Sequence, residues 1–128
     1  MNNFNLPKMQ EFTFIKPIAQ KIAEDNYASN FATRILEQVN TFNNALGDEY
    51  EAGVCLANFG EVIQFPVAAL GYINPSLLIF FGIDEEGSPR ELIQHVSQIN
   101  FALTSIKRKD TSEAKRPIGV RTKVDNNE

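Results

Sequence analysis

The sequence has little of what metal sites and disulfide scaffolds require. Cys55 is the only cysteine among 128 residues, His95 is the only histidine, and tryptophan is absent. One cysteine excludes an internal disulfide framework and is typical of a reducing compartment, so we expect a cytoplasmic protein. One cysteine and one histidine also exclude a Cys/His zinc site within one chain. We therefore expect no metal and no cofactor.

Long apolar runs and phosphate-binding motifs are missing as well. The longest apolar stretch, 65–83, is interrupted by Gly71, Asn74 and Pro75, and the first twelve residues lack the pattern of a signal peptide. We expect no membrane contact. Neither G-x-x-x-x-G-K-[ST] nor G-x-G-x-x-G occurs. With 43% hydrophobic and 22% charged residues, the chain is typical of one globular domain.

Charge is distributed unevenly. Residues 1–106 carry 5 Lys/Arg against 12 Asp/Glu, whereas residues 107–128 carry 7 against 4. The acidic body disfavours nucleic acid as a partner. Three alternatives stay open for the basic tail: it folds against the body, it holds a phosphorylated ligand, or it is solvated.

Two helices are expected near the N-terminus. Pro17 suits the first position of a short helix over 17–24. Apolar residues recur at steps of three and four from Tyr27 to Leu46, which predicts a long amphipathic helix capped by Asp25 or Asn26 and ending at Gly47.

Three strands are expected to follow. Residues 50–58 alternate, Phe59-Gly60-Glu61 predicts a tight reversal, and a second strand is predicted over 62–72, with Pro66 placing it at an edge or at a bulge. After a turn at Asn74-Pro75-Ser76, the apolar run 77–83 predicts a central strand covered on both faces.

Residues 89–107 allow two interpretations. Ser88-Pro89-Arg90-Glu91 matches a capping box, and apolar residues then recur at helical steps to Ile106, which favours a helix over 89–107. The alternative is a turn at Glu86-Gly87, a fourth strand over 91–95 and a shorter helix from Ser97.

We therefore predict an α+β domain in which a small antiparallel sheet of three or four strands is flanked by an N-terminal and a C-terminal amphipathic helix. Its expected parts are an N-terminal arm over 1–15, the domain itself over 16–107 and a basic, partly disordered segment over 108–128. Helices cover only one face of the central strand. A second copy of the chain would cover the other, which predicts a homo-oligomer, and the N-terminal arm is the alternative cover.

Candidate functional residues are few. On a helix beginning at Pro89, His95 would lie at the rim of the apolar stripe with Gln94 and Gln98 beside it, lining a shallow polar pocket. Phe101 would point away from the stripe and mark a subunit interface. Cys55 is expected to be a buried structural residue.

Three motifs resemble those of a family of small bacterial and phage proteins of unknown function: Asn74-Pro75-Ser76-Leu77, the run LIQHVSQ over 92–98, and Arg116-Pro117-Ile118-Gly119-Val120. Where the family pattern has two arginines before Ile-Gly and an aromatic after it, this chain has Arg116-Pro117 and Val120. The resemblance implies no activity. It suggests that Arg116 acts together with the pocket residues, and Asn74 and Arg121 complete the predicted ligand-binding set.

Three functions follow as hypotheses. The first is a non-enzymatic, homo-oligomeric protein that uses His95 and the glutamines for base- or sugar-like groups and Arg116 and Arg121 for phosphate. If phage-encoded, it would sequester a nucleotide-like signalling ligand of host defence. The second is a protein-interaction module that binds one host protein. The third is a small hydrolase built on His95.

Overall fold

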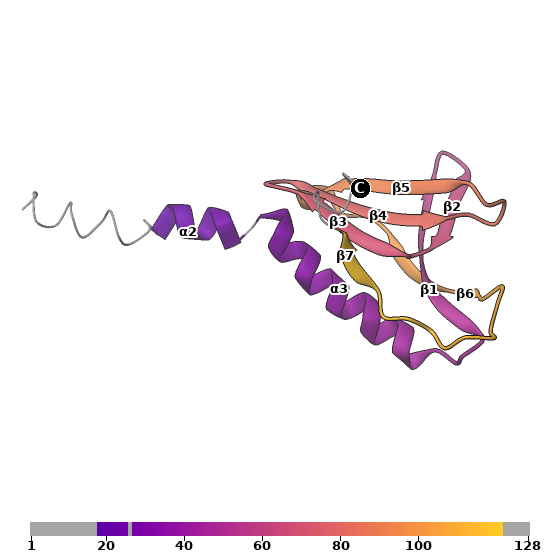
Figure 1. The fold of residues 1–128 in the computed structure, drawn as a ribbon. Coiled ribbons are helices and arrows are strands. Elements are labelled where there is room, and N and C mark those ends of the chain that lie inside the picture. Colours follow the sequence, from indigo (N-terminus) through magenta and orange to yellow (C-terminus); the bar gives the residue numbers. More distant parts are fainter. Residues whose placement is uncertain (1–17, 26, 122–128) are drawn as a thin grey trace, which may run out of the picture.

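The computed structural model describes residues 18–25 and 27–121. They form a mixed α+β fold with one long helix and two sheets (Figure 1). The strand orders are β2-β1-β6 in the three-stranded sheet and β5-β4-β3-β7 in the four-stranded sheet. The elements are α2 (Ile18–Asp25), α3 (Ala28–Ala45), β1 (Tyr50–Asn58), β2 (Glu61–Pro66), β3 (Ala69–Ile73), β4 (Leu77–Ile83), β5 (Pro89–His95), a 3-10 turn (Val96–Gln98), β6 (Ala102–Lys107) and β7 (Gly119–Arg121).

The long N-terminal helix is confirmed as α3, which packs against strands of both sheets (Figure 1). Its apolar stripe buries Ala32 and Val39 in the core. The predicted cap is wrong, because residue 27 precedes the helix without a side-chain bond. The turn before β4 takes over that role: Ser29 N–H donates to Asn74 Oδ1 (2.9 Å) and Ala28 N–H donates to the Pro75 carbonyl (2.8 Å).

The first hairpin forms as predicted. Phe59 (φ 53°) and Gly60 (φ 81°) make a two-residue turn with both residues in the left-handed region, which suits the twist of the β1–β2 hairpin. Pro66 ends β2, which is an edge strand of its sheet.

The predicted second strand over 62–72 is wrong, because the chain changes sheets after Pro66. Val67 N–H donates to the Ala52 carbonyl in one sheet, and Ala68 N–H donates to the Phe81 carbonyl in the other. The ladder with β1 therefore stops at Pro66, and β3 pairs instead with β4. As predicted, β4 is central and buried on both faces.

The C-terminal helix over 89–107 does not exist. Its residues form β5, a 3-10 turn and β6. Asp84 selects this outcome, since its Oδ1 accepts the N–H groups of Glu86 and Ser88 (both 2.9 Å) and Arg90 binds its Oδ2. The turn places β5 beside β4. The hydrogen bonds of this strand pair outweigh the helical spacing of the apolar residues in 89–107. The alternative interpretation is right for the turn and for the strand to His95, but its helix from Ser97 is wrong.

Residues 108–121 lie against the body. The Lys115 ammonium group donates to the carbonyls of Asn43 (2.6 Å) and Leu46 (3.2 Å) at the C-terminal end of α3, where a cation is favourable. Asn40 holds Ile118, and β7 then pairs in parallel with β3. The expected N-terminal arm and the last seven residues lie outside the described residues.

Candidate functional site

The four-stranded sheet has one face that α3 does not cover. Strand alternation sends Leu70, Leu78 and Phe80 into the core beneath α3. The opposite face carries residues from all four strands, and we call it the open face. Its members are Ala69, Gly71, Ile73, Leu77, Ile79, Phe81, Ile83, Pro89, Glu91, Ile93, His95, Gly119 and Arg121.

Aliphatic side chains dominate the open face. Ile73, Ile83 and Ile93 retain 55%, 57% and 54% of their accessible surface, whereas Ile79 and Phe81 between them are buried. Exposed aliphatic side chains on one face of a small domain make that face a candidate binding surface.

Arg121 lies on this face above an aromatic ring. Its guanidinium carbon is 4.5 Å from the centre of the Phe81 ring, a cation–π contact. Gly71 makes the arrangement possible, because a Cβ at this position would come within 2.7 Å of the Phe81 ring. Within the described part of the chain no carboxylate or carbonyl accepts a hydrogen bond from Arg121, so its N–H donors remain available to a ligand.

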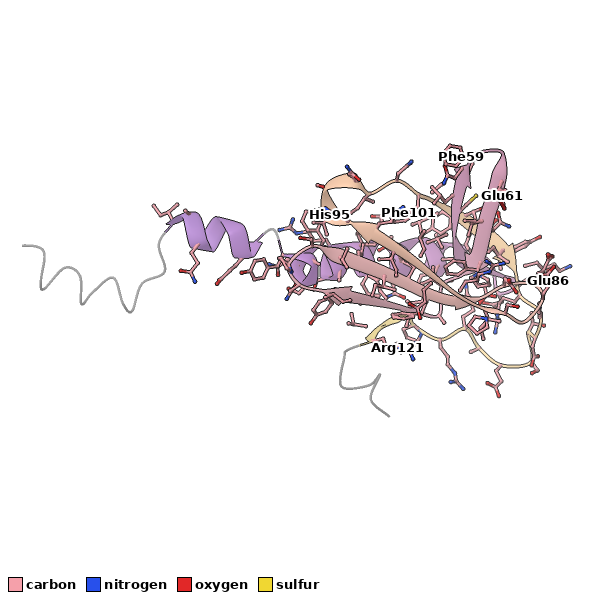
Figure 2. The ribbon with its side chains drawn as sticks, turned by 90° about the horizontal axis from the view of Figure 1, so that it is seen from above. Phe59, Glu61, Glu86, His95, Phe101 and Arg121 are labelled. Atoms are coloured by element: carbon pink, nitrogen blue, oxygen red, sulfur yellow. The ribbon has the colours of Figure 1, made fainter. Side chains whose placement is uncertain are left out.

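His95 reaches the same face at the other edge strand. Figure 2 shows Arg121 and His95 well separated across the sheet. Nδ1 of His95 accepts the Ser97 N–H (3.2 Å) and lies 2.8 Å from the Ser97 hydroxyl, which closes the 3-10 turn. Because Nδ1 accepts the Ser97 N–H, the neutral ring carries its proton on Nε2, and His95 is exposed to solvent.

The remaining predicted ligand-binding residues do not join this face as a cluster. Asn74 caps α3. The Gln94 amide faces inward and bonds the backbone of Asn100 in both directions (2.9 and 3.0 Å). Gln98 lies in the exposed 3-10 turn, and Arg116 is 86% exposed beside Glu113 in the segment before β7. Successive strand residues point to opposite faces, so the pocket that a helix would have formed from Gln94 and His95 is absent.

Phe101 does not occupy the exposed helix face on which its interface assignment rested. Its ring packs edge-on against Phe80, with centroids 4.6 Å apart, and it is half-buried at the core. Sequence reasoning missed Phe81 and Gly71 as site residues. The available signal was Gly71 itself, since a glycine inside a strand marks a close approach of another group.

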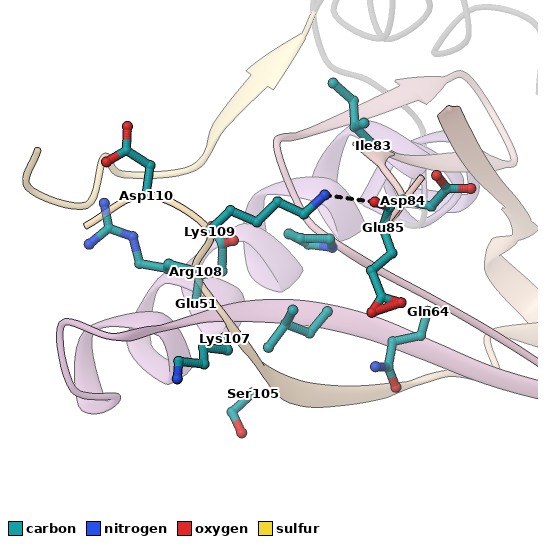
Figure 3. Close-up of a pocket in the computed structure, with 12 residues that line it drawn as sticks. Glu51, Gln64, Ile83, Asp84, Glu85, Ser105, Lys107, Arg108, Lys109 and Asp110 are labelled. Atoms are coloured by element: carbon teal, nitrogen blue, oxygen red, sulfur yellow. Dashed lines mark hydrogen bonds between the residues drawn. The ribbon is translucent and has the colours of Figure 1, made fainter. Parts of the chain in front are cut away.

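A cleft of about 750 Å³ lies at the far end of the sheets, between the ends of β1, β2 and β4 and residues 107–110 (Figure 3). Two of its three cations, Arg108 and Lys109, are engaged by backbone carbonyls. Lys109 Nζ donates to the Glu85 carbonyl (2.7 Å), and Arg108 donates to the carbonyls of Asp48 (2.8 Å) and Glu113 (2.7 Å). These hydrogen bonds fix the two side chains at the wall of the cleft. They also occupy N–H donors that an anionic ligand would need.

Glu51 lines this cleft and an adjoining cavity of about 340 Å³. Burial raises the pKa of its carboxyl group, and the nearby cations of Arg108 and Lys115 offset part of that increase. The ionised form of Glu51 is therefore less favourable in the folded protein than in the unfolded chain, although cations lie near it.

A family model matches the described fold from the second residue of α2 to the end of β7. A family of unknown function, DUF6173, matches residues 19–121. The chain belongs to this family. The DUF6173 region therefore includes residues 108–121, with Arg116 and Arg121, as part of the domain. No curated protein and no solved structure matches the chain. No helix in the described residues has the length and apolar character required to cross a bilayer.

Proposed function

We propose that the protein is a non-enzymatic binding protein that sequesters a small phosphorylated, nucleotide-like ligand on the open face. The observation that carries the proposal is the position of Arg121, a cation with available donors stacked on Phe81 within an apolar sheet surface. A guanidinium group binds phosphate oxygens through two parallel hydrogen bonds, and the ring beneath it restricts its orientation.

The rest of the open face suits the remainder of such a ligand. From β7 to β5 the face spans three strand spacings, about 14 Å, which is long enough for a nucleotide carrying more than one phosphate. The exposed aliphatic side chain of Ile93 offers an apolar surface for a base or a sugar. At the far edge the Nε2–H of His95 supplies a donor for a second polar group.

The biological setting extends this proposal. The motifs at 74–77 and 92–98 resemble those of small bacterial and phage proteins. In a phage-encoded protein, sequestration of a host signalling nucleotide would interfere with host defence without any chemical step. The ligand would then be released with the mass it had when it was bound.

The test is native mass spectrometry of the full chain after incubation with a filtered small-molecule extract of bacterial cells. We expect one phosphorus-containing mass to bind and to be recovered unchanged on denaturation. Arg121→Gln should lose this uptake. Arg34→Gln is the matched control, because Arg34 also stacks on a phenylalanine, Phe31, but from α3 (5.9 Å). Uptake that survives Arg121→Gln, or recovery of a converted product, would contradict the proposal.

A protein partner is the second candidate, favoured by the exposure of Ile73, Ile83 and Ile93 on one face. Under this hypothesis Ile73→Lys abolishes capture of a single host protein while Arg121→Gln leaves it intact. The reverse pattern favours the nucleotide-like ligand.

A further inference from the structure

The outer edge of β5 has unpaired backbone groups. β5 is the outermost strand of its sheet (Figure 1), and two bonds fix its hydrogen-bonding pattern: Asp84 N–H donates to the Ser88 carbonyl, and Val96 N–H donates to the Ser76 carbonyl. Bonds to β4 therefore fall on the even-numbered residues of β5. The N–H and C=O groups of Glu91, Ile93 and His95 point away from β4, and no described strand pairs with them.

The side chains of the same three residues form a self-complementary pattern. Glu91, Ile93 and His95 all lie on the open face, in the order acid, aliphatic, imidazole. In an antiparallel pair centred on Ile93, each Ile93 lies opposite its copy. Each Glu91 carboxylate then lies opposite the partner's His95, whose Nε2–H is a donor. Opposite partners at facing positions stabilise a sheet.

Other registers of the same edge lack this match. A shift that sets Glu91 opposite the partner's Glu91 places two carboxylates face to face, which is destabilising. A shift that sets Glu91 opposite the partner's Ile93 leaves the carboxylate without a partner and exposes His95. Centring on Ile93 also covers a side chain that is 54% exposed in the single chain.

We propose that two copies of this chain pair through β5 in the antiparallel register centred on Ile93. Three facing pairs exchange roughly six backbone hydrogen bonds. The two four-stranded sheets become one sheet of eight strands, and their open faces become one continuous surface with an Arg121 near each outer edge. The pairing is argued without the ligand proposed above, but it engages the Nε2–H of His95, so that in the dimer the ligand would be held through Arg121 and the apolar surface. It uses neither Phe101 nor the N-terminal residues.

A disulfide trap tests the register directly. Facing residues that exchange backbone hydrogen bonds have Cα atoms about 5.5 Å apart, which a disulfide spans. On a Cys55→Ala background of the full chain, we expect Ile93→Cys to cross-link into a dimer on mild oxidation. The control is Val62→Cys, which replaces an exposed aliphatic residue (66%) on the edge strand β2. Equal cross-linking of the two variants would overturn the proposal.

Charge exchange tests the pairing in the unmodified backbone. Sedimentation equilibrium should show a dimer for the full chain, with a Kd raised about tenfold or more by Glu91→Lys or by His95→Glu. The double variant, which combines Glu91→Lys with His95→Glu, restores opposite charges at the facing positions and should recover the dimer to within about threefold of the wild-type Kd. Thermal melts verify that each variant is folded. A wild-type chain that stays monomeric, or a dimer that neither single variant weakens, would overturn the proposal.

Discussion

The side-chain amide of Asn40 binds both backbone groups of Ile118: Nδ2 donates to the carbonyl and Oδ1 accepts the N–H, each at 2.9 Å. This pair of bonds joins the middle of α3 to a residue 78 positions later in the chain. Ile118 immediately precedes β7, so the contact sets where β7 begins against β3 and hence where Arg121 lies.

The first prediction concerns this contact. Asn40→Ala removes both bonds and leaves the half-buried backbone of Ile118 without its partners, which should cost about 1–3 kcal/mol of unfolding free energy. It should also abolish ligand uptake, because β7 loses its anchor. Asn44→Ala, an exposed change on the same helix, is the control for chemical denaturation and native mass spectrometry. Normal uptake by Asn40→Ala would show that the contact does not position Arg121.

The second prediction concerns the junction of the two sheets. A Cβ on Gly82 would collide with the Pro66 carbonyl and the Phe65 ring, so β4 and β2 could not keep their present separation. Gly82→Ala should therefore lower the unfolding free energy by about 2 kcal/mol or more. Gly47→Ala meets no atom within 4 Å and should be close to neutral. Equal denaturation midpoints for the two variants would contradict the packing described.

The third prediction is a pH dependence at the β4–β5 turn. Hydrogen bonds from Ser88, Arg90 and Glu86 lower the pKa of Asp84 below its ordinary value. A lowered pKa means that the ionised group stabilises the fold at neutral pH, and that this contribution disappears as the pH falls through the lowered pKa. Asp84→Asn should therefore melt below the wild type at pH 7, with the difference narrowing in acid. Glu86→Gln is the control and should have the melting temperature of the wild type at each pH. If the difference in melting temperature between Asp84→Asn and the wild type did not change with pH, the prediction would be wrong.

The fourth prediction concerns Glu51, whose pKa is shifted in the opposite direction to that of Asp84. Burial raises the pKa of Glu51, so its ionised form is less favourable in the folded protein than in the unfolded chain. Glu51→Gln should melt above the wild type at neutral pH, and the two should converge as the pH falls below the ordinary carboxyl pKa. Glu49→Gln is the control on the adjacent loop. A lower melting temperature for Glu51→Gln at pH 7 would show that Arg108 and Lys115 outweigh burial.

Local signals were sufficient for several elements. The periodic stripe predicted α3, the Phe59-Gly60 pair predicted the first hairpin, and the apolar run predicted the central strand β4. Each is determined by residues close in sequence. The region 89–107 failed because Leu92, Val96, Ile99 and Leu103 satisfy a helical period although the segment forms strands. The deciding contacts are the Asp84 turn and the pairing of β5 with β4, which lie outside the segment.

Only part of the candidate site was predicted, because strand pairing decides on which face of the sheet a side chain lies. Arg121 and His95 were both in the predicted ligand-binding set, and the structure puts both on the open face. Phe81 could not be distinguished within an apolar run, because strand register alone decides which of Phe80 and Phe81 faces the core. Gln94 was assigned to the ligand on a helical model, and alternation along β5 turns it to the inner face, where it binds Asn100.

The central claim is that the ligand lies on the open face and that Arg121 holds its phosphate. Amide chemical-shift mapping of the isotope-labelled full chain, before and after loading with the ligand recovered from extract, tests this claim most directly. We predict the largest shifts at Gly71, Phe81 and Arg121, with Lys107–Asp110 in the cleft unchanged. Shifts confined to the cleft, with the open face unaffected, would contradict the account.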